Sequence, residues 1–526
     1  MGNKNLKLTK LALALGLTVG LTGCFSDNDN DVVVTPPDPG GDTVKIPTPD
    51  TPPALSSYIS LIVTDNANDN VVSSSISFLA DGEAFTGVTA LDGSALTEAD
   101  TQSDTGSFTF KLADGVTVDD FVVVVNAENY IQNSAVVDIS GDQDVIDVAV
   151  KLISAEGIVK TVTGTSTGGK LAEAVAEENI SIPTDIELQD ADGNPVSGEV
   201  TIAVAAADTG AGDVNAADLI PAGLNNGTAG AGQVLVPAAV VTVNIDAGGT
   251  AVKKLSAPVE LTANIASDFK AGLAQGDSFD VFTYNEVTGV WSDLGSDATL
   301  GELSNNSFPA KFETSNFSSF VPVEAVAACS TPVSFAFTGT EVPASGLNLR
   351  IASNTLKIIE KIKQSNGTLF SADAAKNAGI TATSTVDIAV VDDNGNSWGS
   401  ASGVSLCGEI TLNLAPQVTY TDQTFALTYT CSNSDTPDDT LNFTGALVRY
   451  NQAGKAPLIA TETSAGTYSL TGLQNEATYQ ISVIPVGVDV GSASLTVADF
   501  VAGGDNPSFN VARDNCSVQV VTGSGS

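Results

Sequence analysis

The stretch IELQDADGNPVSGEVTIAV, Ile186 to Val204, decides the fold of this 526-residue chain. Its apolar residues alternate with polar ones on both sides of an Asp-Gly-Asn turn, which is the pattern of two β-strands joined tightly. After Ser56, short β-branched runs of the same kind recur along the chain, separated by Gly, Asn and Asp. Short strands at regular spacing with turn residues between them are typical of β-sandwiches. The sequence therefore predicts an all-β protein made of tandem β-sandwich modules.

The first predicted module, residues 57–155, has its strands in an informative order. They read YISLIVTD from Tyr58, SISFLAD from Ser75, GSFTFKLADG from Gly106, FVVVVNAENY from Phe121 and VIDVAVKLI from Val145. An opening strand that ends in Asp, a Gly-Ser-Phe strand and a long strand before Ala-x-x-Tyr resemble the carboxypeptidase regulatory-like, transthyretin-like domain. The resemblance implies a structural or docking unit that is not itself catalytic.

The second predicted module, residues 156–326, combines the DADGNPVSG opening with YNEVTGVW further along the chain. This pair resembles a β-sandwich module of cartilage intermediate layer protein relatives and of bacterial surface lipoproteins. Asp190, Asp192 and Asn194 are candidate calcium ligands. An EF-hand loop has glycine at its sixth position, whereas Gly193 is fourth from Asp190, so a tight hairpin turn explains the same residues. The expectation is no cofactor, with structural Ca²⁺ as the alternative.

Three aromatic residues are candidate platforms for a sugar ring: Trp291, Trp398 and Tyr284. A tryptophan that follows a hairpin turn is more often part of a hydrophobic core, and this is the competing interpretation. Aromatic residues make up only 6% of the chain, which weakens the sugar-binding interpretation.

Four cysteines divide the last third of the chain into two modules, residues 327–416 and 417–526. CSTPVSFAFTG from Cys329 and CSNSDTPDDTLNFTG from Cys431 begin similar units, and the segments that start at Cys407 and Cys516 end them. This tandem repeat favours disulfides between Cys329 and Cys407 and between Cys431 and Cys516, out of three possible connectivities. A four-cysteine metal site is disfavoured because the CxxC spacing is missing.

Within the last module, GTYSLTGLQNEATYQISVIPV resembles the fibronectin type III pattern, which is Ig-like, and also suits the transthyretin-like plan. The resemblance implies a structural tyrosine corner at Tyr479. The preceding module holds a basic cluster in this acidic chain: Arg350, Lys357, Lys361, Lys363 and Lys376. It is interpreted either as a patch for an acidic glycan or acidic neighbour, or as solvated lysines on a helix or hairpin.

Composition excludes several classes of function. The chain carries 62 Asp and Glu against 20 Lys and Arg, a formal net charge of −42, and it has no histidine. Such a negative field repels nucleic acid, so no nucleic-acid partner is expected. The lack of histidine removes Ser-His-Asp and Cys-His catalysis as well as histidine-ligated metals. Carboxylate-only hydrolysis, as in glycosidases, survives as an alternative.

The start of the chain predicts a targeting signal. Three lysines and the apolar run LALALGLTVGLTG form a signal peptide over residues 1–23. Thr22 and Gly23 before Cys24 resemble a bacterial lipobox, which implies lipidation of Cys24 and a membrane partner through that lipid. An ordinary signal peptide whose Cys24 later forms a disulfide is the competing interpretation. Phe25, where inner-membrane lipoproteins commonly carry aspartate, favours the outer membrane.

Residues 24–56 are predicted to be a disordered tether, because an acidic run is followed by seven prolines that cannot form a helix or a sheet ladder. Together these features predict a lipid-anchored outer-membrane protein that is displayed at the cell surface and is not an enzyme. Its modules would act as a stalk or adhesive, with an extracellular polysaccharide or another surface protein as partner. The alternatives are a glycan-binding accessory lipoprotein, the carboxylate-only hydrolase, and a position on the periplasmic face.

Overall fold

The computed structural model describes residues 43–48, 57–80, 83–139, 145–210, 214, 216–436, 438–486, 495–514 and 516–522. Cys24 and the signal peptide lie outside the described residues. The regular structure of the described chain is almost entirely β-strand, and its helices are the short α1 (Glu98–Thr101), α2 (Ala216–Leu219) and α3 (Ala372–Asn377). The predicted all-β class of tandem sandwich modules is confirmed. Four groups of strands, here called modules 1 to 4, are β2–β10, β11–β24, β25–β31 and β32–β41.

Module 1 consists of two sheets, ordered β10-β2-β7-β5 and β4-β3-β8-β9, with β6 against β3. Alternate residues of β2, Ile59, Leu61 and Val63, point into the core between the sheets. The bounds are β2 (Tyr58–Asp65), β3 (Ser74–Ala80), β4 (Glu83–Ala84), β5 (Val88–Thr89), β6 (Gln102–Ser103), β7 (Ser107–Leu112), β8 (Asp120–Asn126), β9 (Asn133–Asp138) and β10 (Val145–Leu152).

Module 2 is one continuous sheet whose main path runs β12-β11-β16-β18-β24-β21-β22-β23-β20-β14-β13, with β15 on β20, β17 on β24 and β19 on β18. The sheet folds over, so that β20 packs across the core from β16 and β18. The bounds are β11 (Val159–Thr167), β12 (Lys170–Leu171), β13 (Val175–Ala176), β14 (Ile180–Ile182), β15 (Leu188–Gln189), β16 (Gly198–Asp208), β17 (Gln233–Pro237), β18 (Ala239–Ala247), β19 (Thr250–Val252), β20 (Lys254–Ala266), β21 (Ser278–Asn285), β22 (Val290–Leu300), β23 (Ser307–Asn316) and β24 (Ser319–Ala327).

Module 3 packs the sheet β28-β25-β31 against the sheet β27-β26-β29-β30. Its strands are β25 (Val333–Gly339), β26 (Leu347–Ala352), β27 (Lys357–Ile362), β28 (Asn366–Phe370), β29 (Thr385–Val391), β30 (Ser397–Ser405) and β31 (Glu409–Leu414). Because Leu347, Leu349 and Ile351 of β26 fill the core, Asn348 and Arg350 are left on the opposite face of the sheet.

Module 4 packs β33-β32-β37-β36, with β40 on β32, against β35-β34-β38-β39. The bounds are β32 (Tyr420–Cys431), β33 (Leu441–Asn442), β34 (Ala446–Asn451), β35 (Leu458–Ile459), β36 (Thr461–Ser464), β37 (Thr467–Gln474), β38 (Thr478–Pro485), β39 (Leu495–Val501), β40 (Ser508–Arg513) and β41 (Val518–Thr522). Tyr479 is fully buried, and its hydroxyl accepts a hydrogen bond from the Gln474 backbone N–H (2.9 Å), as a tyrosine corner would.

Modules 1, 3 and 4 share one connection: the first strand pairs in parallel with a strand near the end of the module. The pairs are β2 with β10, β25 with β31, and β32 with β40. Module 1 therefore shares the strand connection of modules 3 and 4, whereas the sequence predicts a repeat for modules 3 and 4 only.

A strand of the predicted tether belongs to this fold. β1 (Thr43–Pro47) pairs antiparallel with β41, and the Thr48 N–H donates to the Ser517 carbonyl oxygen (2.9 Å). The prediction of a disordered tether through residue 56 is therefore wrong for Thr43–Pro47. The only proline of this strand is its last residue, so Val44 and Ile46 keep their backbone N–H groups for pairing with β41, and the Lys45 N–H donates to Asp435 on the other side.

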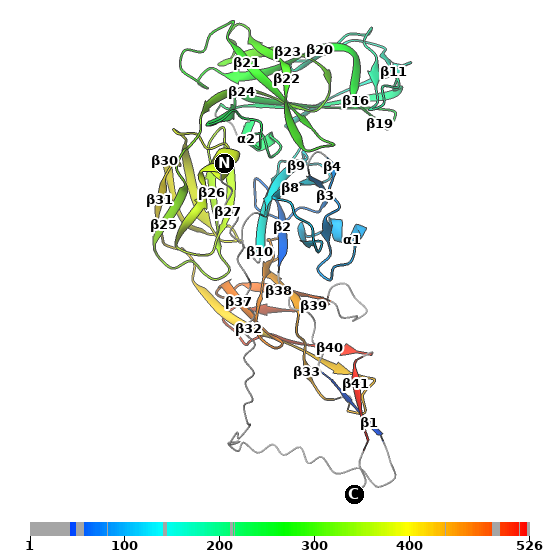
Figure 1. Ribbon diagram of the computed structural model, residues 1–526, viewed down its shortest axis with the longest axis vertical. Helices are drawn as coiled ribbons and strands as arrows, with labels where there is room; N and C mark the ends of the chain where they lie inside the picture. The colour runs from blue at the N-terminus through cyan, green and yellow to red at the C-terminus, as the bar shows by residue number, and fades with distance from the viewer. Residues whose placement is uncertain are drawn as a thin grey trace, which may run out of the picture.

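The modules do not form a single file (Figure 1). Module 2 lies at one end of the long axis and module 4, with β1 and β41, at the other, while modules 1 and 3 lie side by side between them. In the middle of the molecule, β10 of module 1 runs next to β27 of module 3. This side-by-side contact creates the site described next.

Candidate functional site: a charged cavity where three modules meet

The predicted sugar platforms are in the hydrophobic cores. Trp291 and Trp398 are each 3% exposed and Tyr284 is 2% exposed. The Trp291 Nε1–H donates to the Ala222 carbonyl oxygen (3.2 Å), and the Trp398 Nε1–H donates to the Tyr420 hydroxyl (3.0 Å). The structure contradicts the platform prediction because a platform must be exposed. The hairpin that brings Trp291 onto Tyr284, with ring centroids 5.2 Å apart, turns both rings inward.

The predicted calcium ligands form the hairpin turn that was the competing interpretation. Asp190 Oδ1 accepts the backbone N–H groups of Asp192 (2.9 Å) and Asn194 (2.8 Å), and the Asn194 amide donates to Asp190 Oδ2 (3.0 Å). These hydrogen bonds hold the pKa of Asp190 below its ordinary value. In the described part of the chain, no group of three or more Asp, Glu or Cys side chains is arranged to hold a metal ion.

Both predicted disulfides are present: Cys329 is bonded to Cys407, and Cys431 to Cys516. The predicted repeat, however, is out of phase. Cys329 precedes β25, the first strand of module 3, whereas Cys431 is the last residue of β32, the first strand of module 4. The bonds therefore tie opposite ends of equivalent parallel strand pairs. The sequence does not reveal this shift, because Cys329 and Cys431 both lie next to a similar β-branched run. Cys329 precedes its run, whereas Cys431 follows its run.

The basic cluster of module 3 faces other modules. Arg350 Nη2 lies 3.0 Å from Asp69 Oδ1, and Lys363 Nζ lies 2.8 Å from Asp147 Oδ2, both in module 1. Lys357 contacts Asp218 of module 2, and Lys376 Nζ donates to the Ala229 carbonyl oxygen of module 2 (3.5 Å). Lys361 stays within module 3, at 2.6 Å from Asp393. The prediction of an acidic neighbour is the one that fits, and the neighbours are in the same chain.

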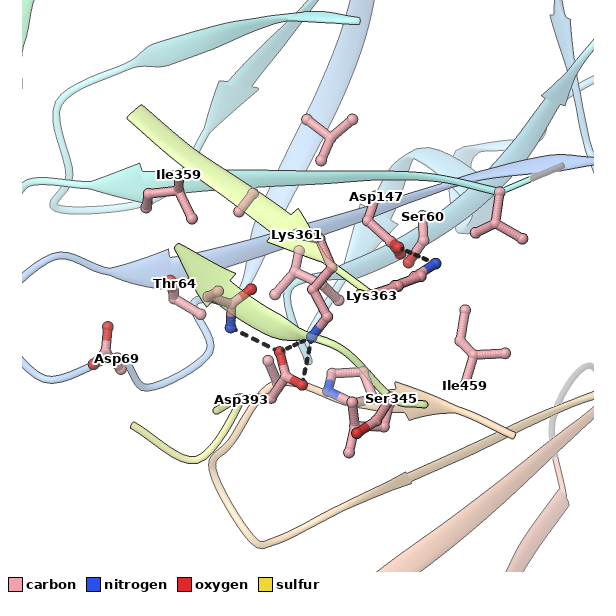
Figure 2. Close-up of a pocket in the computed structure, with 18 of the residues that line it drawn as sticks. Ser60, Thr64, Asp69, Asp147, Ser345, Ile359, Lys361, Lys363, Asp393 and Ile459 are labelled. Atoms are coloured by element: carbon pink, nitrogen blue, oxygen red, sulfur yellow. Dashed lines mark hydrogen bonds and ion pairs between the residues drawn. The ribbon is translucent and has the colours of Figure 1, made fainter. Parts of the chain in front are cut away.

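A cavity of about 300 Å³ lies where modules 1, 3 and 4 meet (Figure 2). On β2 the residues that alternate with the core face it, among them Ser60 and Thr64. β10 contributes Asp147 and Lys151, β26 contributes Asn348 and Arg350, and β27 contributes Ile359 and Lys361. Residues Ala456 to Ile459 of module 4 close one side. The cavity is thus bounded by the outer faces of two sheets that each turn their other face to a core.

Ion pairs cover the wall of the cavity. Figure 2 shows the Lys361 Nζ bonded to both carboxylate oxygens of Asp393. Asp393 also accepts a hydrogen bond from the Asn348 amide (2.9 Å). Lys151 contacts the same Asp69 oxygen as Arg350. Burial, followed by the neighbouring Arg350, lowers the pKa of Lys151 to about 7. Burial, followed by Asp147, raises the pKa of Tyr58 to about 12, so this phenol stays protonated.

Edge strands meet at the cavity. β10, β27 and β35 each lie at the end of their sheet order. Edge strands expose backbone hydrogen-bonding groups, and charged side chains on them discourage pairing with other chains. β27, KIIEKI, carries three charges in six residues. Its Glu360, next to Asp138 of module 1, has its pKa raised to about 7, chiefly by burial.

Sequence reasoning missed the acidic half of the site. Asp69, Asp147 and Asp393 gave no signal among 62 acidic residues. A local signal did exist in β2 and β10, where Ser60, Asp147 and Lys151 interrupt otherwise apolar strands. The outer face of these two strands is polar and yet is covered. A covered polar face indicates that another module packs against it.

No protein-family model matches the chain, and no curated protein matches it. Among solved structures, the chain is similar to the minor pilin GBS52 of Streptococcus agalactiae, with 11% identity, 36% of this chain and 98% of that chain covered, and a TM-score of 0.17. It is also similar to the major pilin SpaD of Corynebacterium diphtheriae, with 10% identity, 87% and 97% covered, and a TM-score of 0.13. For two B repeat units of the collagen-binding protein of Staphylococcus aureus, the identity is 12%, the coverage 90% and 100%, and the TM-score 0.12. TM-scores this low carry no argument about function, and the fold class rests on the strand pairing itself.

Proposed function

We propose that this protein is a lipid-anchored, non-enzymatic display protein of the bacterial outer membrane, whose modules form a stalk with an adhesive or matrix-interacting surface. The observation that carries the proposal is the pairing of β1 with β41. It ties the segment that follows the lipobox to the module 4 end of the molecule, opposite module 2 (Figure 1). An anchor at Cys24 would then hold module 4 nearest the membrane and present module 2 outward.

The ion pairs between modules support a stalk. The contacts of Arg350 and Lys363 with module 1 and of Lys357 with module 2 fix module 3 against both. Cores over 59–152, 153–323, 329–414 and 425–516 support the proposed division at residues 57–155, 156–326, 327–416 and 417–526. Among the described residues, no helix is both long and apolar enough to cross a membrane.

The state of the cavity acids supports a non-enzymatic role. Asp69, Asp147 and Asp393 each contact a lysine or an arginine. Each of these three carboxylates is thus already held by a cation of the wall, whereas a glycosidase needs two carboxyl groups that face the sugar bond. The arrangement therefore favours a structural or binding role for these residues over hydrolysis.

Two experiments on cells test the proposal. Metabolic labelling with a fatty-acid analogue should mark the wild-type chain and not the Cys24→Ser variant. A protease site inserted at the exposed turn around Leu303 of module 2 should be cut on intact cells, with a periplasmic protein left uncut as the control. Protection of this site until the outer membrane is broken would refute surface display and place the protein on the periplasmic face. An unlabelled wild-type chain would refute the lipid anchor.

A further inference from the structure

The wall of the three-module cavity has more positive than negative side chains. Among the described residues that line it are four cations, Lys151, Arg350, Lys361 and Lys363, and three carboxylates, Asp69, Asp147 and Asp393. The imbalance lies at Asp69, whose Oδ1 serves both Lys151 and Arg350. Lys151, whose pKa is about 7, carries the fourth positive charge below that pH, and the wall then has one positive charge in excess, which attracts anions in this otherwise acidic chain.

One donor in this wall lacks an acceptor. Arg350 Nε is buried, and no described residue accepts a hydrogen bond from it. Leaving a buried donor of a charged group unsatisfied costs free energy, which a small shift of the guanidinium toward an anionic oxygen in the cavity would recover. The excess charge and the unsatisfied donor belong to the same side chain, so they mark one place for a carboxylate.

The rest of the wall suits a molecule that is rich in hydroxyl groups. Ser60, Ser345 and Asn348 line the cavity, and the aliphatic side chains of Ile359 and Ile459 face it (Figure 2). Hydroxyl and amide side chains exchange hydrogen bonds with sugar hydroxyls, and aliphatic groups cover the C–H surface of a ring. A volume of about 300 Å³ limits the occupant to a small organic molecule.

Access to the cavity is from the side of Lys363 and Asp147. These side chains are 47% and 30% exposed, whereas Lys361 and Asp393 are only 13% and 15% exposed. Arg350 is 30% exposed, as Asp147 is, so a ligand that enters past the Lys363–Asp147 pair would reach Arg350 directly and the more buried Lys361 behind it.

We propose that the cavity binds a small sugar acid, such as a uronic acid, with its carboxylate on Arg350 and Lys151 and its hydroxyls on Ser60, Ser345 and Asn348. The proposal rests on the matrix-interacting role given above and assigns that role a ligand class. The aromatic residues that the sequence offers for sugar binding have no part in it. The carboxylate separates this class from neutral sugars, and the hydroxyl-lined wall separates it from simple organic anions.

The test is calorimetric titration of the detergent-solubilised full chain with D-galacturonate, D-glucuronate and N-acetylneuraminate. D-galactose, which lacks the carboxylate, and acetate, which lacks the hydroxyls, are the matched probes. At least one sugar acid should bind about tenfold or more tightly than both, since a charge-assisted hydrogen bond contributes roughly that factor. Acetate binding as tightly as the sugar acids, galactose doing so, or no binding by any sugar acid would each overturn the proposal. If a trigalacturonide binds as tightly as the monosaccharide, the cavity can bind a sugar acid at the end of a polysaccharide as well as a free one.

Variants tie binding to the cavity. Arg350→Gln should weaken binding of the sugar acid about tenfold or more, and Ala149→Phe should block it by filling the cavity without changing a charge. Lys311→Gln, which removes an exposed lysine of module 2, is the matched control and should bind normally. Thermal melting checks that each variant is folded. Unchanged binding by folded Ala149→Phe would place any bound sugar acid elsewhere. Because the titration uses purified protein, its failure would leave surface display intact, and failure of display would leave the titration valid.

Discussion

The disulfide of module 3 allows the sharpest prediction. Cys329 and Cys407 are separated by 78 residues and lie before the parallel strands β25 and β31. Closing a loop of this length removes chain entropy from the unfolded state, which corresponds to about 4.5 kcal/mol at 25 °C. Replacing both cysteines by alanine should therefore lower the free energy of unfolding of module 3 by about 4 kcal/mol.

The two tryptophans of the chain make this measurable one module at a time. Trp398 lies in the core of module 3, and Trp291 in module 2. In a Trp291→Phe background, the fluorescence of Trp398 follows the urea unfolding of module 3, including the loss of its contact with Tyr420 at the start of module 4. Its midpoint should fall by about 2–3 M urea, given the slope of about 1.5–2 kcal/mol per molar usual for a domain of this size.

The second disulfide provides the matched control, because Cys431 and Cys516 close a loop of 85 residues in module 4. Replacing this pair by alanine in the same background should shift the Trp398 transition by less than about 1 kcal/mol, the order of an indirect effect through the interface. The reasoning is refuted if the two pairs shift the transition equally, or if loss of Cys329 and Cys407 costs less than about 1 kcal/mol.

Three further predictions concern the contacts between modules. Asp69→Asn should lower the free energy of unfolding by about 2 kcal/mol, since it leaves Lys151 and Arg350 without their shared carboxylate. Loss of Glu260, the exposed partner of Lys311, should lower it by at most about 1 kcal/mol. Urea titrations compare the two variants. Glu360 has its pKa raised from 4.5 to about 7, so its contribution to stability is present at low pH and is lost as the pH rises through this window. Glu360→Gln should remove that loss, about 3 kcal/mol at most, when urea midpoints at pH 5 and pH 8 are compared. Lys45→Pro removes an N–H that donates to Asp435 (2.6 Å) and should release β1, seen as faster amide exchange in β41, while exchange in β2 stays unchanged.

Strand positions could be predicted closely because they depend on local residue patterns. The predicted strand YISLIVTD matches β2 at both ends. The predicted strand VIDVAVKLI is one residue longer than β10. In β2, however, the outward-facing Ser60 and Thr64 are also buried, because module 3 and module 4 cover the outer face. A pattern in one strand shows which residues alternate, and it does not show what lies on either side.

The cavity could not be predicted because its parts are far apart in the sequence. Asp69, Arg350 and Ile459 meet only after three modules have packed together. The basic cluster was a real signal, since three of its members face other modules through ion pairs. The aromatic signal failed for a physical reason: the Tyr284 and Trp291 rings contribute most when they are buried, and both are in a second apolar cluster of module 2, on the side of module 1.

The basic cluster also explains how modules of one strongly acidic chain can pack side by side. Negative surfaces repel each other over distances that salt screens, with a Debye length of about 30 Å at 0.01 M and about 8 Å at 0.15 M. The pairs of Lys357 and Lys363 are short and partly buried, so salt weakens them less than it weakens the long-range repulsion. Adding salt over this range should therefore keep or reduce the radius of gyration measured by X-ray scattering. The Lys357→Gln, Lys363→Gln double variant should be expanded at 0.01 M and compact again at 0.15 M. Expansion of the wild-type chain on adding salt would show that the ion pairs, rather than the repulsion, dominate the balance between modules.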